Sequence, residues 1–459
     1  MPLTTSTGAA VADTTISALR EQLRGRLITQ EDDDYVAAKA IWNSYFEKNP
    51  GAIVRCAGAA DVIAAVRFAA ENDVPVTMRG AGHDFSGKSS IQDGLVIDLS
   101  RQKGILVDPA SSTAIAQPGL LQGEFDHETQ AFGLAVTGSQ ESYIGVGGLT
   151  LSGGLGWLGR YRGLLSDNLI WADIVLANGE LRRTSAREEP DLFWAIRGAG
   201  ANFGVGVSFK YRLYPQGMCL AGLLAFPIAE TPMVASALEE YNQNIPDALS
   251  TSFAFITTPE GERAVALGFV HADPGPESEQ KVVAPMRKFG TRTLMDFCGP
   301  MPYLAVQRML DENTEAGWRF YPRSFGMDRL HPEAMQILAE GFAANPSDRS
   351  LVGGGLMGGA MARLDATATA FPHRTGHLVS ILSAWTDPAD DEANARWTDE
   401  VYGRLLPYTN GAVYVSHLGT DSAERTPNAY GPNYDRLMML KAKYDPQNLF
   451  RNGHNIPRS

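Results

Sequence analysis

Cysteine and histidine are scarce in this 459-residue chain, which has three cysteines and eight histidines. Cys56, Cys219 and Cys298 stand far apart, without the paired spacing of a disulfide framework or a zinc site. We therefore expect free thiols in a reducing compartment and no metal site. The sequence also lacks a run of about 18 apolar residues, which a membrane-spanning helix needs. Its N-terminus lacks the basic and then apolar pattern of a signal peptide, so a cytoplasmic protein is expected.

Positive charge is also in deficit, because 39 Lys and Arg face 52 Asp and Glu, for a net charge of −13. No basic stripe offsets this balance, so the composition argues against a nucleic-acid partner. With 44 % hydrophobic and 20 % charged residues, the chain has the composition of an ordinary globular protein. Its length predicts two or more domains.

Residue patterns predict an α+β first half with many short strands. Residues 14–48 are expected to be helical, and a β-α-β unit is expected to end in the strand 74–78. Asn178-Gly179 joins two apolar runs as in a β-hairpin. From about residue 221 we expect a second domain of helices at 279–290, 301–312 and 331–345, with strands at 251–257, 264–270, 351–359 and 377–385. A last amphipathic helix should stop at Asp445-Pro446.

Glycine is concentrated in three stretches of the first half, "RGAGHDFSG" (79–87), "GVGGLTLSGGLG" (145–156) and "RGAGANFGVG" (197–206). Consecutive glycines let backbone N–H groups approach phosphate oxygens. None of the three has the G-x-G-x-x-G pattern and distant acidic residue of a nicotinamide site, and the Walker pattern is absent. Three such stretches still predict a large, flat or phosphate-bearing ligand.

Four segments follow one another in a characteristic order: "RGAGH", "IGVGGLTLSGGLGWL", "DLFWAIRGAGANFGVGVSF" and the tail "YGPNYDRLMMLKAKYDPQNLFRNGHNIP". Together they resemble the berberine-bridge-enzyme-like branch of the vanillyl-alcohol oxidase (VAO) superfamily, near bacterial members of the 6-hydroxy-D-nicotine oxidase type. The resemblance implies an α+β, two-domain PCMH/VAO-type FAD-binding fold. The FAD-binding domain would span 1–220, with its core at about 46–217. An α/β substrate domain, an antiparallel sheet covered by helices, would span 221–415, and the segment 416–459 would return to the FAD domain.

The same resemblance implies an FAD-linked oxidase of secondary metabolism. A hydride from a C–N or C–O bond of an alkaloid-, sugar- or polyketide-like molecule would pass to flavin N5. Reoxidation by O2 would give H2O2. Two alternatives stay open, a dehydrogenase that passes electrons to another acceptor and a flavin-bound cyclisation catalyst without net redox. The expected partners are the small substrate and O2, without a membrane or nucleic acid, and the sequence leaves monomer and homodimer open.

By this resemblance His83 is joined covalently to FAD. Glu141 stands where many relatives have a cysteine that makes a second bond, so attachment through His83 alone is expected. Ile144 precedes the G-x-G-G segment, at a position that gates oxygen in some relatives, and its intermediate size leaves oxidase and dehydrogenase open. The remaining cofactor-binding residues implied are Arg79, Gly80, Ala81, Gly82, Asp84, Ser86, Gly87, Gly138, Ser139, Gly145, Gly147, Gly148, Gly153, Gly154, Gly206, Val207 and Asn455.

A base for the substrate proton is expected among the tyrosines. Tyr430 matches a tyrosine that serves as base in carbohydrate-oxidising relatives, and Tyr143 and Tyr414 are secondary candidates. A phenol with a pKa of about 10 needs a cationic neighbour or the flavin to act near neutrality. His373 and His377 have the four-residue offset of a helical metal pair. Their flanking proline and glycine argue against a helix, so packing or substrate contact is favoured there.

Overall fold

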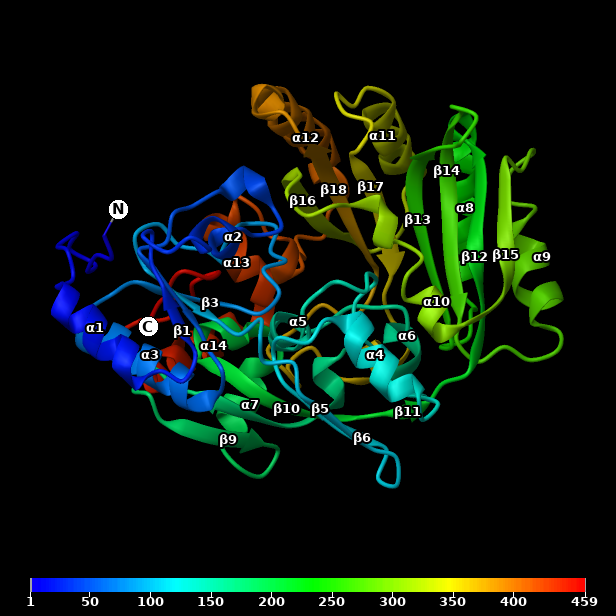
Figure 1. The fold of residues 1–459 in the computed structure, drawn as a ribbon. Helices are drawn as coiled ribbons and strands as arrows, with labels where there is room; N and C mark the ends of the chain where they lie inside the picture. Colours follow the sequence, from blue (N-terminus) through cyan, green and yellow to red (C-terminus); the bar gives the residue numbers. More distant parts are fainter. Residues whose placement is uncertain (1, 459) are drawn as a thin grey trace.

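The chain has two halves, which face one another in the computed structural model (Figure 1). The structure describes residues 2–458. Two smaller sheets and a two-stranded ribbon build one half, and a single seven-stranded sheet builds the other. The α+β prediction is confirmed. Within the described residues, no helix combines the length and apolar character needed to cross a membrane.

The first sheet carries the predicted β-α-β unit. Its strand order is β1-β2-β4-β3, and β2, β4 and β3 run parallel. Helix α3 (Ala59–Glu71) connects β2 to β3 and buries Val62, Ala65 and Val66 against the sheet. The strands are β1 (Arg26–Ile28), β2 (Ala52–Arg55), β3 (Val76–Arg79) and β4 (Leu95–Asp98).

The expectation of helix throughout 14–48 is wrong in part. The structure has two short α-helices there, α1 (Asp13–Gln22) and α2 (Tyr35–Lys39), with strand β1 between them and a single 3-10 turn at Ser44–Phe46. The chain leaves α1 because the Asp61 carboxylate accepts hydrogen bonds from the backbone N–H groups of Arg24 and Gly25, both at 2.9 Å. These contacts span more than thirty residues, so local periodicity does not reveal them.

The second sheet is antiparallel, with the order β5-β6-β10-β8-β9. The Asn178-Gly179 turn joins β8 to β9, as predicted, and Gly179 takes the positive φ of 75° that this turn requires. The strands are β5 (Ile105–Asp108), β6 (Thr113–Ala116), β8 (Leu169–Val175), β9 (Leu181–Ser185) and β10 (Val205–Arg212), and a short ribbon pairs β7 (Leu134–Ala135) with β11 (Tyr214–Pro215). The helices of this half are α4 (Gln122–Gln130), α5 (Val146–Ser152), α6 (Gly159–Arg162) and α7 (Pro190–Ala199).

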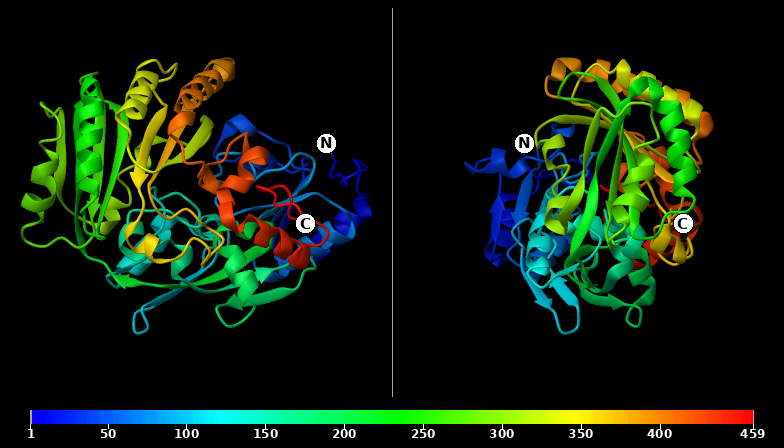
Figure 2. Two further views of the ribbon diagram at one scale, coloured as in Figure 1. Left: turned by 180° about the vertical axis from the view of Figure 1, so that it is seen from behind. Right: turned by 90° about the vertical axis from the view of Figure 1, so that its right-hand side faces the viewer.

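The seven-stranded sheet is antiparallel throughout, in the order β15-β12-β14-β13-β17-β18-β16. Figure 2 shows three long helices side by side on one face, coloured green, olive and orange. They are α8 (Thr231–Asn242), α11 (Pro332–Ala343) and α12 (Asp391–Leu405), and the shorter α9 (Ala284–Met286) and α10 (Tyr303–Val306) lie nearby. The strands are β12 (Met218–Pro227), β13 (Leu249–Thr257), β14 (Arg263–His271), β15 (Met295–Pro302), β16 (Arg319–Met327), β17 (Leu351–Leu356) and β18 (His377–Trp385).

Strand predictions succeeded for β13, β14, β17 and β18 but missed β12 and the two edge strands of this sheet. The expected strands at 251–257, 264–270 and 377–385 match β13, β14 and β18. The segment 301–312 is wrong as a helix, because β15 continues to Pro302 and α10 is a single turn. Strand β16 is buried along nearly its whole length, and β15 is largely exposed. Neither therefore shows the polar and apolar alternation by which a strand is recognised.

Strand β13 shows that the two faces of the large sheet carry side chains of different size. Phe253 and Phe255 are buried with the helices, whereas Ser252 and Ala254 point to the opposite face. That opposite face is turned toward the first half of the molecule. Its small side chains leave room between the two halves.

The C-terminal helices α13 (Ser422–Tyr430) and α14 (Tyr434–Tyr444) return to the first half, where their apolar residues join its core. Residues 218–385 supply all strands of the large sheet, yet Phe371 packs in the core of the first half. The domain boundaries at 220 and 415 stay predictions.

A buried ion pair stabilises the packing of the C-terminal segment against the first half. The Lys441 ammonium and the Asp445 carboxylate have no exposed side-chain surface and lie 2.7 Å apart. Lys441 also donates to the carbonyl oxygens of Asn202 at 2.7 Å and Phe450 at 3.1 Å. Asp445 accepts the backbone N–H groups of Leu449 and Phe450. One side chain thus joins α14, the tail and the turn before β10.

Replacing Lys441 by methionine should destabilise the protein strongly. The substitution keeps the volume but leaves the Asp445 carboxylate buried without its cation, at a cost of about 3–5 kcal/mol. Lys443→Met is the matched control, since the Lys443 side chain is 55 % exposed. Urea unfolding followed by circular dichroism should show a much lower midpoint for Lys441→Met alone. Equal midpoints for the two variants would contradict the structural role of the pair.

Candidate active site

A cavity of about 840 Å³ lies between the uncovered face of the large sheet and the first half. This volume is in the range of small-molecule and cofactor sites. One wall is formed by the loop after β3, the turn into α5 and the chain's tail, and the other by β13, β17 and β18. The three glycine-rich stretches all reach this cavity, as Gly82, Gly148 and Gly200 show.

His83 lies in the loop after β3, on an aromatic support. Its ring stacks on Trp42 with centroids 4.0 Å apart, and Phe85 and Tyr143 lie at 5.7 and 5.6 Å. Burial lowers the pKa of His83 to about 4. The imidazole is therefore uncharged at neutral pH and keeps a nitrogen lone pair available.

Asp84 holds the His83 loop in shape. Its carboxylate accepts hydrogen bonds from the backbone N–H groups of Ser86 and Lys88 and from the Ser86 hydroxyl, each at 2.9 Å. At the start of the loop, Arg79 pairs with the buried Asp98 at 2.9 Å. The position of His83 is thus set from both sides.

The glycines before and within α5 bring the backbone close to its neighbours. A Cβ at Gly145 would lie 2.8 Å from the Ala81 Cβ, and one at Gly147 would lie 2.8 Å from Pro118. A Cβ at Gly148 would meet nothing within 4 Å and would project into the cavity. The absence of a side chain at Gly148 therefore leaves space in the cavity that any other residue would occupy.

The tail closes the cavity beside the His83 loop. The Asn452 amide donates to the carbonyl oxygens of Lys88 and Ser90, at 2.9 and 3.1 Å. The Asn202 amide donates to the His454 carbonyl oxygen at 3.1 Å. His454 lines the cavity, and its buried Nδ1 has no hydrogen-bond partner among residues 2–458. An unpartnered polar atom at this wall fits a bound polar ligand.

Most of the predicted site residues come together at this cavity. Those that line it are Arg79, Gly80, Ala81, Gly82, His83, Asp84, Ser139, Tyr143, Ile144, Gly145, Gly147, Gly148, Gly206, Tyr414 and Tyr430. The structure places a smaller group behind the lining, namely Ser86, Gly87, Gly138, Gly153, Gly154, Val207 and Asn455. These support the walls. A Cβ at Gly87, for example, would lie 2.3 Å from Phe46, and one at Gly153 would lie 2.9 Å from Phe371.

The three candidate tyrosines differ in environment. Tyr430 is 2 % exposed, and burial raises its pKa well above the usual phenol value. Burial raises the pKa of Tyr143 to about 12, and its hydroxyl is hydrogen-bonded to Thr314. Tyr414 accepts a hydrogen bond from the Gly154 N–H at 3.3 Å, and its ring packs on His417 with centroids 4.9 Å apart. None of the three has a cationic partner among the described residues.

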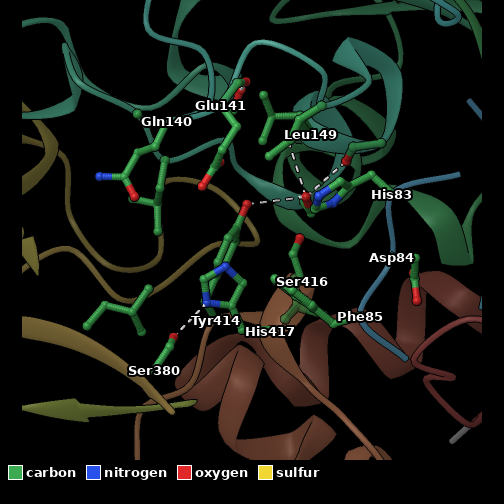
Figure 3. Close-up of a pocket in the computed structure, with 18 of the residues that line it drawn as sticks. His83, Asp84, Phe85, Gln140, Glu141, Leu149, Ser380, Tyr414, Ser416 and His417 are labelled. Atoms are coloured by element: carbon green, nitrogen blue, oxygen red, sulfur yellow. Dashed lines mark hydrogen bonds between the residues drawn. The ribbon is translucent and has the colours of Figure 1, made fainter. Parts of the chain in front are cut away.

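Glu141 is a cavity residue that sequence reasoning did not propose for catalysis. Its carboxyl projects into the cavity from the turn before α5, and Tyr414 projects from another wall (Figure 3). Burial first, and the negative charge of Asp311 second, raise the pKa of Glu141 to about 7. The only signal in the sequence was the acid at a position where many relatives have cysteine.

His373 and His377 contact different partners. His377 begins β18 and contacts the Glu239 carboxylate at 3.1 Å, whereas His373 contacts the Asn428 carbonyl oxygen at 2.9 Å. Both line a separate cavity of about 130 Å³, so packing, and not contact with the large cavity, accounts for them. Residues 2–458 contain no cluster of three His, Cys, Asp or Glu that could hold a metal ion.

Comparisons with known proteins agree with this geometry. Residues 50–185 match the FAD binding domain family, and residues 413–457 match the berberine and berberine-like family. The chain is 30 % identical over 443 residues to an FAD-linked oxidoreductase of Dictyostelium discoideum, covering 95 % of each protein. It is 30 % identical over 453 residues to (R)-6-hydroxynicotine oxidase of Paenarthrobacter nicotinovorans, covering 95 % of this chain and 97 % of the relative.

Solved structures extend the likeness to the whole fold. The crystal structure of 6-hydroxy-D-nicotine oxidase from Arthrobacter nicotinovorans matches with a TM-score of 0.86 and 28 % identity, over 95 % of this chain and 98 % of that one. A berberine bridge enzyme variant has the same fold, with a TM-score of 0.86 at 21 % identity. The chain thus belongs to the berberine-bridge-enzyme-like FAD-linked oxidoreductases and has their two-domain PCMH/VAO-type FAD-binding fold.

Proposed function

We propose that this enzyme is an oxidase that takes a hydride from a C–N or C–O bond of a small organic substrate, with FAD joined to His83. The observation that carries the proposal is the uncharged His83 ring, stacked on Trp42 at the wall of a cavity edged by glycines. The alkaloid-, sugar- or polyketide-like substrates implied by the motifs favour a role in secondary metabolism. The free thiols Cys56, Cys219 and Cys298 favour a cytoplasmic enzyme.

The residues around the cavity fit FAD. Gly148 leaves a cradle without a side chain, and the His454 Nδ1 lacks a partner among residues 2–458. When bound, FAD supplies the acceptor for the hydride and its electron pair. The glycine segments and the tail residues Asn452 to His454 would hold it.

His83 suits a covalent attachment for two reasons. Bond formation requires the unprotonated imidazole, and its pKa of about 4 keeps it in this form at neutral pH. The Trp42 stack and the Asp84 hydrogen bonds fix the ring and its loop before any bond forms. Within the described residues, no cysteine lines the cavity, and Glu141 at the position of the relatives' second attachment is no thiol, which supports a single bond.

Ile144 supports the choice of oxidase. It is partly exposed, lines the cavity and directly precedes Gly145. Its side chain branches at Cβ and carries one δ-carbon where leucine carries two, so it is narrower at its tip and leaves more room for O2 there. A relative at 30 % identity, (R)-6-hydroxynicotine oxidase, is named as an oxidase.

The oxidase activity is tested by mixing the protein anaerobically with amines, alcohols and aromatic polyketide mimics. A substrate should bleach the yellow flavin, and admission of air should restore the colour with formation of H2O2. A flavin that stays reduced in air would contradict the oxidase and favour the dehydrogenase alternative. A substrate converted to a cyclic product without bleaching would favour the cyclisation catalyst.

His83→Ala should abolish covalent attachment. Acid-precipitated wild-type protein should stay yellow, whereas the variant should release its flavin into the supernatant because no bond retains it. His373→Ala is the matched control, since His373 lies outside the large cavity. Its precipitate should stay yellow. Wild-type flavin that washes out freely would disprove the attachment.

Ile144→Leu should slow reoxidation of the reduced enzyme by about tenfold, equivalent to about 1.4 kcal/mol of activation free energy. The second δ-methyl of leucine would occupy the space beside Gly145, whereas Ile144→Val should keep the wild-type rate. Stopped-flow measurement of flavin absorbance after mixing with O2 gives both rates. Unchanged reoxidation in the leucine variant would exclude Ile144 as the oxygen gate.

A further inference from the structure

The acidic side chains that line the large cavity differ in how far they are engaged by its walls. Its carboxylic acids, among the described residues, are Asp84 and Glu141. Asp84 accepts three hydrogen bonds from its own loop. Arg79 pairs with Asp98, and Arg160 donates to the carbonyl oxygens of Leu249 and Met357 at 2.8 and 2.6 Å. Glu141 is therefore the acid left for substrate.

The carboxyl of Glu141 is not neutralised by a cation. Within residues 2–458 it pairs with no Lys, Arg or His, and the hydrogen bond that it receives comes from its own backbone N–H. The titratable groups facing it are Tyr143 on its own turn, Asp311 from the segment after α10, and Tyr414 across the cavity. Asp311 is held in place by the Ser142 N–H at 2.8 Å and the Ser142 hydroxyl at 2.6 Å.

The tyrosines and His417 of the cavity are poorly suited to accept a proton near neutral pH. The phenols of Tyr143 and Tyr430 have raised pKa values and are protonated. His417 has its pKa lowered to about 4, and its Nδ1 is hydrogen-bonded to Ser380 at 3.1 Å. A carboxyl whose pKa is about 7 lies in the range where a general base is most effective at neutral pH.

We propose that Glu141 is the catalytic base of this enzyme. The assignment rests on the proposed oxidase function. The substrate C–H bond breaks with its electron pair, and this hydride goes to FAD. The N–H or O–H bond on the neighbouring atom breaks with its proton going to the Glu141 carboxylate, and a C=N or C=O bond forms. The proton then leaves Glu141 for solvent, so one hydride and one proton are accounted for.

The proposal predicts a specific pH dependence. The carboxylate is the active form, so the rate of flavin reduction by substrate should rise with pH below about 7 and level off above it. Glu141→Gln keeps the size of the side chain and removes the base. It should reduce flavin at least about a hundredfold more slowly, with no rise in this pH range, while the substrate Kd from the flavin absorbance change stays within a few-fold. Glu141→Asp should recover part of the rate.

Asp311→Asn is the matched control. The charge of Asp311 raises the pKa of Glu141, so this variant should move the midpoint of the profile to lower pH and keep the plateau rate.

The unfolding temperature gives a second test, which does not depend on substrate turnover. The raised pKa means that folding opposes ionisation of Glu141, so the carboxyl lowers stability as the pH rises from its unfolded pKa toward 7. Glu141→Gln should therefore raise the unfolding temperature at pH 8 relative to wild type, and have no such effect at pH 4.

Three results would each contradict a different part of the proposal. A wild type whose flavin no substrate reduces contradicts the proposed oxidase and, with it, this role of Glu141. A wild type that is reduced, together with a Glu141→Gln variant that is equally fast or keeps the pH rise, contradicts Glu141 as base and leaves the oxidase intact. Equal unfolding temperatures for wild type and variant at pH 8 would contradict the buried, uncompensated state of the carboxyl.

Discussion

Burial of ionisable groups around one cavity determines the protonation states on which the chemistry of this site depends. The same removal from water lowers the pKa values of His83, His417 and His454 to about 4 and raises that of Glu141 to about 7. Neutral imidazoles and a carboxyl that ionises near neutrality therefore share one cavity. The first property suits attachment of a cofactor, and the second suits transfer of a proton.

The fold maintains this environment by bringing distant segments of the chain together. The large sheet presents small side chains such as Ser252 and Ala254 to the cavity, while helices cover its other face. The tail returns to contact the His83 loop through Asn452, and the Lys441–Asp445 pair holds that return. Loss of one partner of a buried ion pair lowers the free energy of unfolding strongly. The Lys441–Asp445 pair therefore couples the stability of the protein to the position of the tail at the cavity.

The parts of the fold and of the site that depend on local sequence patterns could be predicted from the sequence. The glycine stretches, the hairpin at Asn178-Gly179 and the end of α14 before Asp445 depend on local conformational preferences. Edge strands β15 and β16 could not be predicted, since their burial is set by neighbours far along the chain. The same holds for Glu141, whose pKa depends on Asp311 and on the cavity, and for the separation of His373 from the large cavity. The spacing of residues along the sequence does not determine how far a side chain is removed from water in the folded protein.

The attachment of FAD at His83 is tested most directly by tryptic mapping of the purified protein. Cleavage after Arg79 and Lys88 releases the peptide "GAGHDFSGK", which contains His83. If His83 holds the cofactor, this peptide alone should carry the yellow absorbance and the added mass of one flavin nucleotide, with the modification on the imidazole. A peptide of unmodified mass, obtained from protein that was yellow before digestion, would contradict this attachment.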